Sequence, residues 1–168
     1  MADACLKEAK NSFSCRVCYC EVPILFTEQG VDLSFGEIHS ASLKKRLTGC
    51  DRGVIFAATV GLEIDRLISK YSRISPAKAL CLQALGAQRI EALCDVFCEE
   101  MKKRAAQNGE FVTPRFSPGY GDLPLAVQRK LFDVLDCSRR IGVMLNESLL
   151  MTPTKSVTAI MGLGKDKQ

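Results

Sequence analysis

Six consecutive residues, Arg115 to Tyr120, combine a fixed cation, a rigid turn and an aromatic ring. The guanidinium of Arg115 is a planar fork that pairs well with a carboxylate. Pro118 fixes its own φ at about −65° and Gly119 can adopt a positive φ, so a tight turn here can direct nearby backbone N–H groups outward. This combination predicts a cradle for a small zwitterionic ligand that carries a flat base. The alternative is an ordinary surface turn, in which Tyr120 packs on the core and Arg115 pairs with a neighbouring acid.

A second group with chemical potential is a cluster of cysteines near the amino terminus. Cys15, Cys18 and Cys20 could place three thiolates around zinc or an iron–sulfur cluster, with Cys5 or Cys50 as a fourth ligand. However, no second cysteine pair follows at the spacing of a zinc knuckle. Alternation along a strand would put Cys18 and Cys20 on one face, which favours packing in a core or at a sheet edge.

The remaining residues form no strong catalytic pattern. His39 is the only histidine and has no identifiable third partner, so a Ser-His-Asp triad is not favoured. No glycine-rich phosphate loop occurs. Glu63 and Asp65 follow a predicted strand, where ligand groups are often found, but an acidic first helical turn explains them equally well.

Length and composition favour one soluble domain. A chain of 168 residues can bury about 70% of its unfolded surface without disulfides or metal. No apolar run approaches the roughly 20 residues that span a membrane, and the amino terminus does not resemble a secretory signal. We therefore expect a cytoplasmic protein with reduced thiols and no membrane partner. The net charge of +4 is dispersed and no aromatic residues interleave with the basic ones, so nucleic-acid binding is not expected.

Hydrophobic periodicity predicts a mixture of helices and strands. Residues 53–60 are apolar on both faces, which predicts a central strand covered on each side. Ser75-Pro76 is a typical helix start and Asn108-Gly109 a typical helix end, so a helix of about thirty residues should lie between them despite Gly86. Further helices are expected at 3–12, 40–47, 61–71 and 124–136, and strands at 17–26 near a sheet edge, at 31–35, and at 142–150 and 157–161 as a closing pair.

The order of these elements indicates the fold class. Helices and strands are mixed without a regular βαβ repeat, and short turns separate the last strands. This pattern predicts an α+β fold with a largely antiparallel, twisted sheet flanked by helices. We expect one domain over residues 1–162, followed by a polar carboxy-terminal tail over residues 163–168.

The carboxy-terminal half resembles the activation domain of cobalamin-dependent methionine synthase. The features that carry the resemblance are an Arg-x-x-x-Gly-Tyr motif at 115–120, a short helix ending near Leu135-Asp136, the run from Gly142 to Ser148, and then Met151, Pro153 and Ser156-Val157. Leu85 to Ala92 is similar to the helix that precedes the ligand loop in that family. The resemblance extends over residues 80–161, is weak before residue 80, and implies the fold of that domain.

The resemblance also implies that the loop binds S-adenosylmethionine. Arg115 would take the ligand carboxylate, and the backbone around Phe116 and Ser117 would meet the adenine edge. Tyr120 would flank the nucleoside, with Gly119 in the turn. This assignment is physically reasonable, because the ligand carries a carboxylate, a sulfonium charge and a flat base.

An acid is also needed for the ammonium or the sulfonium of this ligand. The candidates are Glu110, Glu147, Glu63 and Asp65. Glu147 could face the same pocket as Arg115 or simply solvent, and we include it in the predicted site.

The family's domain acts on a cobalamin held by another module. The present chain contains neither the Asp-x-His-x-x-Gly corrinoid signature nor a folate or homocysteine module. The resemblance therefore implies a reactivation subunit that acts in trans on a cobalamin-dependent methionine synthase or a related corrinoid methyltransferase. Its cofactors would be S-adenosylmethionine and the cobalamin of the partner, with a flavodoxin-type electron donor, and it would not turn over alone. The alternative is a non-catalytic binding or metal-carrying module of the same fold, with Cys15, Cys18 and Cys20 as thiolate ligands.

Overall fold

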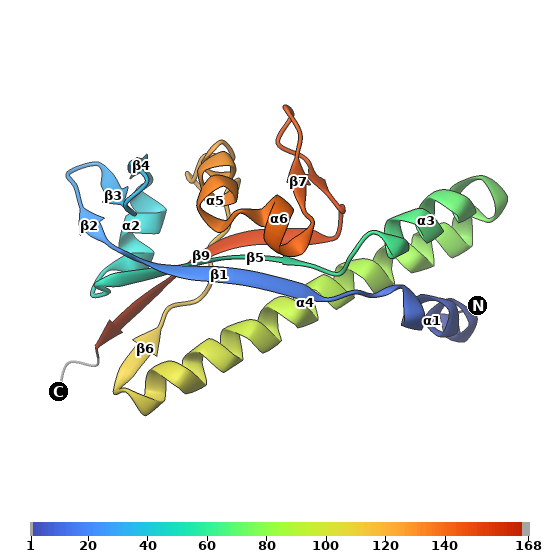
Figure 1. Cartoon of the computed structure of the whole chain (residues 1–168), viewed down its shortest axis with the longest axis horizontal. Helices are drawn as coiled ribbons and strands as arrows, with labels where there is room; N and C mark the ends of the chain where they lie inside the picture. Colours follow the sequence, from blue (N-terminus) through green and yellow to red (C-terminus); the bar gives the residue numbers. More distant parts are fainter. Residues whose placement is uncertain (1, 166–168) are drawn as a thin grey trace.

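The computed structural model describes residues 2–165, which form an antiparallel sheet covered by helices on both faces (Figure 1). The helices are α1 (Ala2–Ala9), a 3₁₀ turn η1 (Lys10–Ser12), α2 (Ala41–Leu47), α3 (Glu63–Ile74), α4 (Pro76–Gln107), α5 (Val127–Leu135) and α6 (Cys137–Ile141). The strands are β1 (Arg16–Pro23), β2 (Leu25–Phe26), β3 (Gly30–Asp32), β4 (Glu37–His39), β5 (Arg52–Thr59), β6 (Glu110–Val112), β7 (Met144–Leu145), β8 (Met151–Thr152) and β9 (Ser156–Lys165).

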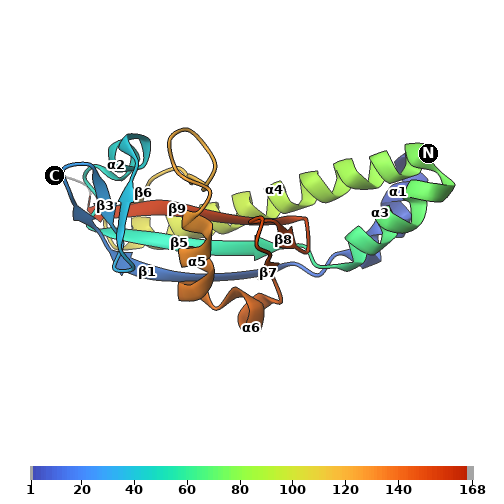
Figure 2. The ribbon, with the colours of Figure 1, turned by 90° about the horizontal axis from the view of Figure 1, so that it is seen from above.

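The main sheet has the strand order β1-β5-β9-β6, and every neighbouring pair is antiparallel. Seen from above, β1, β5 and β9 run side by side along most of their lengths (Figure 2). The α+β fold with an antiparallel sheet is therefore confirmed, as is the central position of the strand predicted at 53–60. The strand predicted at 17–26 was correctly expected near an edge, because β1 is the outermost strand.

Two apolar cores lie on the two faces of this sheet. Ile55 and Ala57 of β5 face the core formed with α2, α5, α6 and the small sheet β2-β3-β4. Val54 and Phe56, on the opposite face of the same strand, pack in the core formed with α1, α3 and α4. The alternation of side chains along a strand explains why a strand with two apolar faces must be central.

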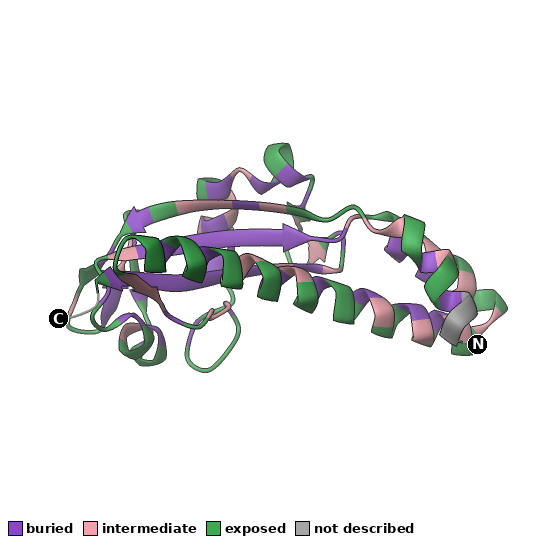
Figure 3. Cartoon of the chain, turned by 90° about the horizontal axis from the view of Figure 1, so that it is seen from below, coloured by how far each residue is buried: buried purple, intermediate pink, exposed green. Residues whose placement is uncertain are grey.

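Helix α4 is the longest element and matches the predicted boundaries. Pro76 occupies its first turn and Asn108 follows its end, with Gly109 at a φ of +66°. At Gly86 the side chain of Lys155 crosses α4, and its Cε lies 3.1 Å from where a Cβ atom would stand. This close approach favours glycine at a position where a helix would otherwise prefer a larger residue. The face of α4 that points away from the sheet is exposed (Figure 3).

Two predictions for the carboxy-terminal region are wrong. The segments 142–150 and 157–161 do not pair with each other: β7 pairs with β8 in a short hairpin, whereas β9 pairs with β5 and β6. β9 is buried on both faces from residue 158 to residue 163, so it belongs inside the main sheet. There β5 pairs with it from Ser156 to Leu163, a length that the two-residue β7 cannot supply. The predicted polar tail is also wrong over residues 163–165, which belong to β9, and residues 166–168 lie outside the described part.

Candidate functional site

The loop that carries the Arg-x-x-x-Gly-Tyr motif, residues 113–123, is attached to the central sheet at its start. We call it the Arg115 loop. Phe116 forms a two-way backbone bridge with Ile160 of β9, with N–H···O distances of 2.8 and 2.9 Å. Thr113 is bonded to Gly162 of the same strand through its backbone N–H and its hydroxyl. Arg115 therefore lies between two fixed points and has little backbone freedom.

The middle of the Arg115 loop is the tight turn that its sequence predicted. Gly119 has a φ of +90°, and the N–H of Tyr120 donates to the carbonyl of Ser117 at 3.3 Å. Pro118 and Gly119 occupy the positions that a type II turn requires of them. Tyr120 is 69% exposed, so the part of the alternative in which it packs on the core is wrong. The other part of that alternative is confirmed, because Arg115 pairs with an acid, Glu91.

Asp122, at the end of the Arg115 loop, binds the amino-terminal end of α2. Its carboxylate accepts hydrogen bonds from the hydroxyl of Ser40 at 2.6 Å and from the N–H of Ala41 at 2.7 Å. The Ser40 hydroxyl in turn accepts from the N–H of Leu43 and caps the helix. These bonds favour the charged form and lower the pKa of Asp122 to about 2. The Arg115 loop and α2 are thus fixed to each other.

Replacing Asp122 by asparagine is expected to lower the thermal midpoint at pH 7, because the variant loses a charged acceptor for several N–H and O–H donors. The folded-state pKa of Asp122 lies below its ordinary value of 3.8, so the carboxylate contributes stability above about pH 4. That contribution disappears as the pH falls through 2. Thermal unfolding followed by circular dichroism should therefore show a difference between the two proteins that narrows from pH 4 to pH 2. Asp51→Asn, at an exposed carboxylate, is the matched control, and a difference that stays constant over this range would contradict the assignment.

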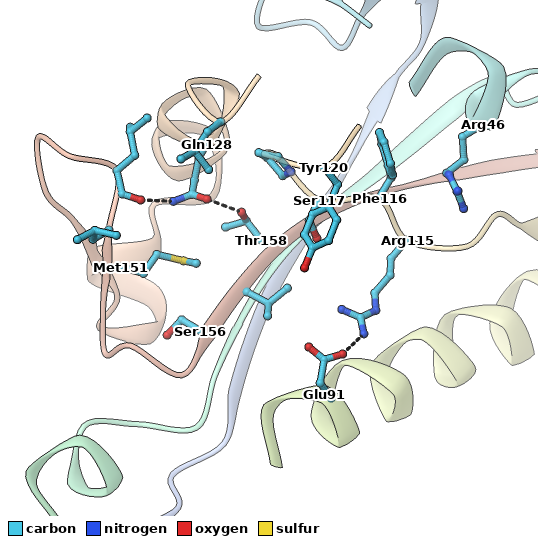
Figure 4. A pocket seen from close by; sticks show the side chains of 15 residues that line it. Arg46, Glu91, Arg115, Phe116, Ser117, Tyr120, Gln128, Met151, Ser156 and Thr158 are labelled. Carbon is cyan, nitrogen blue, oxygen red and sulfur yellow. Dashed lines mark hydrogen bonds and ion pairs between the residues drawn. The ribbon is translucent and has the colours of Figure 1, made fainter. Parts of the chain in front are cut away.

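A cavity of about 730 Å³ lies beside the Arg115 loop (Figure 4). Its volume is within the range of small-molecule sites. The Arg115 loop, α2, α4, α5, the β7–β8 turn and β9 all contribute to its wall. The lining residues are Arg46, Glu91, Arg115, Phe116, Ser117, Pro118, Tyr120, Leu125, Gln128, Leu149, Leu150, Met151, Ser156, Val157 and Thr158.

The charged side chains are gathered at one part of this cavity (Figure 4). Arg115 forms an ion pair with Glu91 of α4, and its Nη2 atom lies 3.7 Å from Oδ1 of Asp95. The guanidinium of Arg46 lies 5.1 Å from the centre of the Phe116 ring and forms no ion pair with any side chain described between residues 5 and 165. The opposite part, around Gln128, Met151 and Thr158, carries no formal charge.

The structure brings most of the predicted site residues together. Arg115, Phe116, Ser117 and Tyr120 line the cavity, and Gly119 shapes the turn between them. One detail differs from the expectation: both backbone groups of Phe116 are bonded to Ile160, so they are not free to meet an adenine edge.

The predicted acids are not among the residues that line the cavity. Glu147 is exposed at the tip of the β7–β8 hairpin, where its carbonyl accepts from Arg129 at 2.7 Å. Glu63 pairs with Arg66, and Glu110 pairs with Arg52 at the far end of the sheet. Asp65 accepts hydrogen bonds from the N–H and the hydroxyl of Thr154.

Sequence reasoning missed most of the other lining residues, among them Glu91, Arg46 and Gln128. Glu91 lies 24 positions before its partner Arg115, and no local pattern connects the two. Arg46 belongs to a short basic cluster that is typical of a solvated helix face. Gln128 did carry a signal: it shares the apolar face of its helix with Leu131 and Leu135, where a polar side chain is unusual.

The cysteines do not assemble into a metal site within the described residues. Cys18 is buried in the core on the α5 side and Cys20 packs against it, whereas Cys15 is exposed. The expected placement of Cys18 and Cys20 on one face of a strand is therefore confirmed. In the other core, burial raises the pKa of Cys94 to about 12, so this thiol stays protonated and packs as a small apolar group. The alternative of a module with Cys15, Cys18 and Cys20 as thiolate ligands finds no support in this arrangement.

Comparisons with known proteins give a family and a fold. The model of one protein family, described as vitamin B12 dependent methionine synthase, activation domain, matches residues 43–168. A crystal structure of the MetH reactivation domain bound to AdoHcy is similar, with a TM-score of 0.74 and 16% sequence identity. The match covers 99% of this chain and 64% of that chain, so this chain spans less than two thirds of its length. The likeness shows a shared fold. No helix within residues 2–165 is both long and apolar enough to cross a membrane.

Proposed function

We propose a function from one premise: the chain belongs to the family of the vitamin B12 dependent methionine synthase activation domain. We infer that its cavity binds S-adenosylmethionine, or S-adenosylhomocysteine as the demethylated form. The bound chain then presents the methyl donor to a corrinoid held by a partner protein. The cobalt chemistry belongs to that partner, and this chain supplies position and electrostatics.

One observation carries the proposal: the cavity is charged at one part and uncharged at the other. S-adenosylmethionine has the same division, since its amino-acid group is zwitterionic and its adenosine group is uncharged. The ligand carboxylate would bind the guanidinium of Arg115, and the ligand ammonium would bind the carboxylate of Glu91. The ion pair between Arg115 and Glu91 is exchanged for two pairs with the ligand, so neither of these two side chains is left without a charged partner.

The remaining groups suit the nucleoside. Tyr120 presents an exposed ring that can stack on the base or lie against the sulfonium. Ser117 lies next to it in the turn, and Met151 with Leu149 offers apolar surface. Glu91 is thus our choice for the acid that the ligand requires. It takes the place of Glu147, which is exposed and does not line the cavity.

Titration calorimetry with S-adenosylhomocysteine, which cannot donate a methyl group, tests this proposal. We expect saturable one-to-one binding by the unmodified chain. Glu91→Gln should weaken this binding about tenfold or more, because the ammonium loses a charged partner. Glu99→Gln, at an acid of the same helix that pairs with Lys102, should leave the affinity unchanged.

A truncated ligand separates the amino-acid contacts from the base contacts. 5′-Methylthioadenosine lacks the amino-acid group, so Glu91→Gln should not change its affinity. Absence of S-adenosylhomocysteine binding to the unmodified chain, both alone and with a corrinoid partner, would refute the proposal. An equal loss of affinity for both ligands in Glu91→Gln would refute the assignment of Glu91.

We further propose that the chain acts in trans. Its partner would be a corrinoid-binding methionine synthase or methyltransferase subunit that lacks an activation domain, with a flavodoxin-type protein as electron donor. Transfer of a labelled methyl group from S-adenosylmethionine to the inactive corrinoid protein should then require this chain. Equal transfer with and without it would contradict action in trans and leave ligand binding untouched.

A further inference from the structure

Gln128 is a lining residue whose carboxamide is buried within a helix-to-sheet contact. It is 4% exposed, and it lies on α5 with its carboxamide directed into the cavity (Figure 4). Its Nε2 donates to the carbonyl of Leu149 at 3.1 Å, and its Oε1 accepts from the hydroxyl of Thr158 at 3.4 Å. A glutamine this deeply buried must find partners for its polar atoms.

The two contacts fix which way round the carboxamide lies. A backbone carbonyl can only accept, so the atom that faces Leu149 must be the NH₂ group. Leu149 has a φ of +63°, and its own N–H is bonded to the carbonyl of Asn146, so its carbonyl is held in position. The amide cannot rotate by 180° without placing two oxygens against each other.

Each of the two amide atoms keeps one hydrogen-bonding position after these contacts. The NH₂ group has two hydrogens and uses one, and the oxygen has two lone pairs and uses one. A donor and an acceptor therefore remain side by side. This pair complements an adenine edge, which presents the N6 amino group as donor beside a ring nitrogen as acceptor, and glutamine is a recurrent partner of that edge.

We propose that Gln128 reads the base of the ligand and selects adenine over 6-oxopurines. This inference rests on the proposed function, since it assumes that a nucleoside occupies the uncharged part of the cavity. The backbone around Phe116 and Ser117 was expected to meet the adenine edge, and both backbone groups of Phe116 are already bonded to Ile160. The charged residues lie at the other part of the cavity, so Gln128 and the hydroxyl groups beside it are the polar side chains that the uncharged part offers to the base.

The fixed orientation of the carboxamide is the source of the selectivity. Hypoxanthine has an oxygen where adenine has the N6 amino group, so this oxygen would face Oε1 of Gln128. At its Watson–Crick edge, hypoxanthine would also turn an N1–H toward the NH₂ group. Either edge leaves buried polar groups without partners, which sites of this kind reject strongly.

The test compares the affinities of S-adenosylhomocysteine and its deaminated analogue, S-inosylhomocysteine, by titration calorimetry. The unmodified chain is expected to bind the adenine form at least about tenfold more tightly, as a bidentate contact implies. Gln128→Met keeps the length of the side chain but removes both polar atoms, and it should bring the ratio of the two affinities close to one.

Arg129→Met is the matched control. Arg129 is the next residue of α5 and also holds the β7–β8 hairpin, through the carbonyl of Glu147, but it does not line the cavity. A structural role of Gln128 would lower both affinities together, as Arg129→Met should, and would not change their ratio.

The outcomes separate this inference from the proposed function. If the unmodified chain binds both compounds equally, or if Gln128→Met keeps the preference, base reading by Gln128 is overturned while ligand binding stands. If the unmodified chain binds neither compound, both alone and with a corrinoid partner, the proposed function itself is overturned, and base reading with it.

Discussion

Replacing Arg115 by methionine is expected to lower the affinity for S-adenosylhomocysteine by about a hundredfold. The variant loses the cation that receives the ligand carboxylate, and it leaves Glu91 without its partner. Truncating one member of such a charge pair costs about 3 kcal/mol of binding free energy, which corresponds to about a hundredfold in affinity. Methionine preserves the packing of the arginine stem, so the loss should come from the charge. Titration calorimetry measures it directly.

Arg46→Met is the control for this experiment, because Arg46 is the other guanidinium of the same cavity. It is stacked on Phe116 and carries no ion pair within the described chain. We expect a smaller loss than for Arg115→Met. A larger loss in Arg46→Met would mean that the ligand carboxylate binds Arg46 of α2 instead of Arg115. Arg115 would then serve to position the carboxylate of Glu91. The affinity for 5′-methylthioadenosine should be unchanged in both variants.

Gly30→Ala is expected to destabilise the fold by about 3 kcal/mol or more. A Cβ atom at this position would lie 1.9 Å from the carbonyl oxygen of Ile38 and 2.8 Å from its carbon. Both atoms belong to the backbone of β4, so a side-chain rotation cannot relieve the clash. The β3–β4 pair, which leads directly into α2, would have to separate. The free energy of unfolding from urea titration gives the loss.

Gly53→Ala is a suitable comparison, because it also places a methyl group on a strand. The nearest atoms to its Cβ would be side-chain carbons of Leu33 and Val22 at 3.5 Å, which is ordinary contact. We expect a change within about 1 kcal/mol of zero. Similar losses in the two variants would mean that strand glycines matter for a reason other than the clash with Ile38.

The parts of the fold that could be predicted are those with strong local signals. Residues 53–60 are apolar on both faces, and a strand of that kind must lie in the interior of a sheet that is covered on both faces. Helix α4 begins at a proline and ends before Asn108-Gly109, so its length could be predicted from these two signals. The turn at Pro118-Gly119 was predictable for the same reason, since few residues fit its dihedral angles.

The parts that could not be predicted depend on contacts between distant segments. The pairing of β9 with β5 rather than with residues 142–150 is decided by the burial of both faces of β9. Glu91 becomes part of the cavity only because α4 crosses the sheet beside the Arg115 loop. The backbone of Phe116 looked free in the sequence and is used by Ile160 in the structure. The sequence therefore predicted the Arg115 loop, but not the residues of α2, α4 and α5 that complete the cavity.

Helix α4 has a consequence for the speed of ligand capture. At 32 residues it is about 48 Å long, with Glu91 near its middle. Its first half is packed against α1 and α3, and its end leads into β6 (Figure 1). Because α4 is held at both ends, its backbone does not carry Glu91 away from Arg115. The Glu91 carboxylate can leave Arg115 only by rotation of its own side chain, which takes picoseconds to nanoseconds. For the ligand proposed above, entry is then set by diffusion to an already formed site.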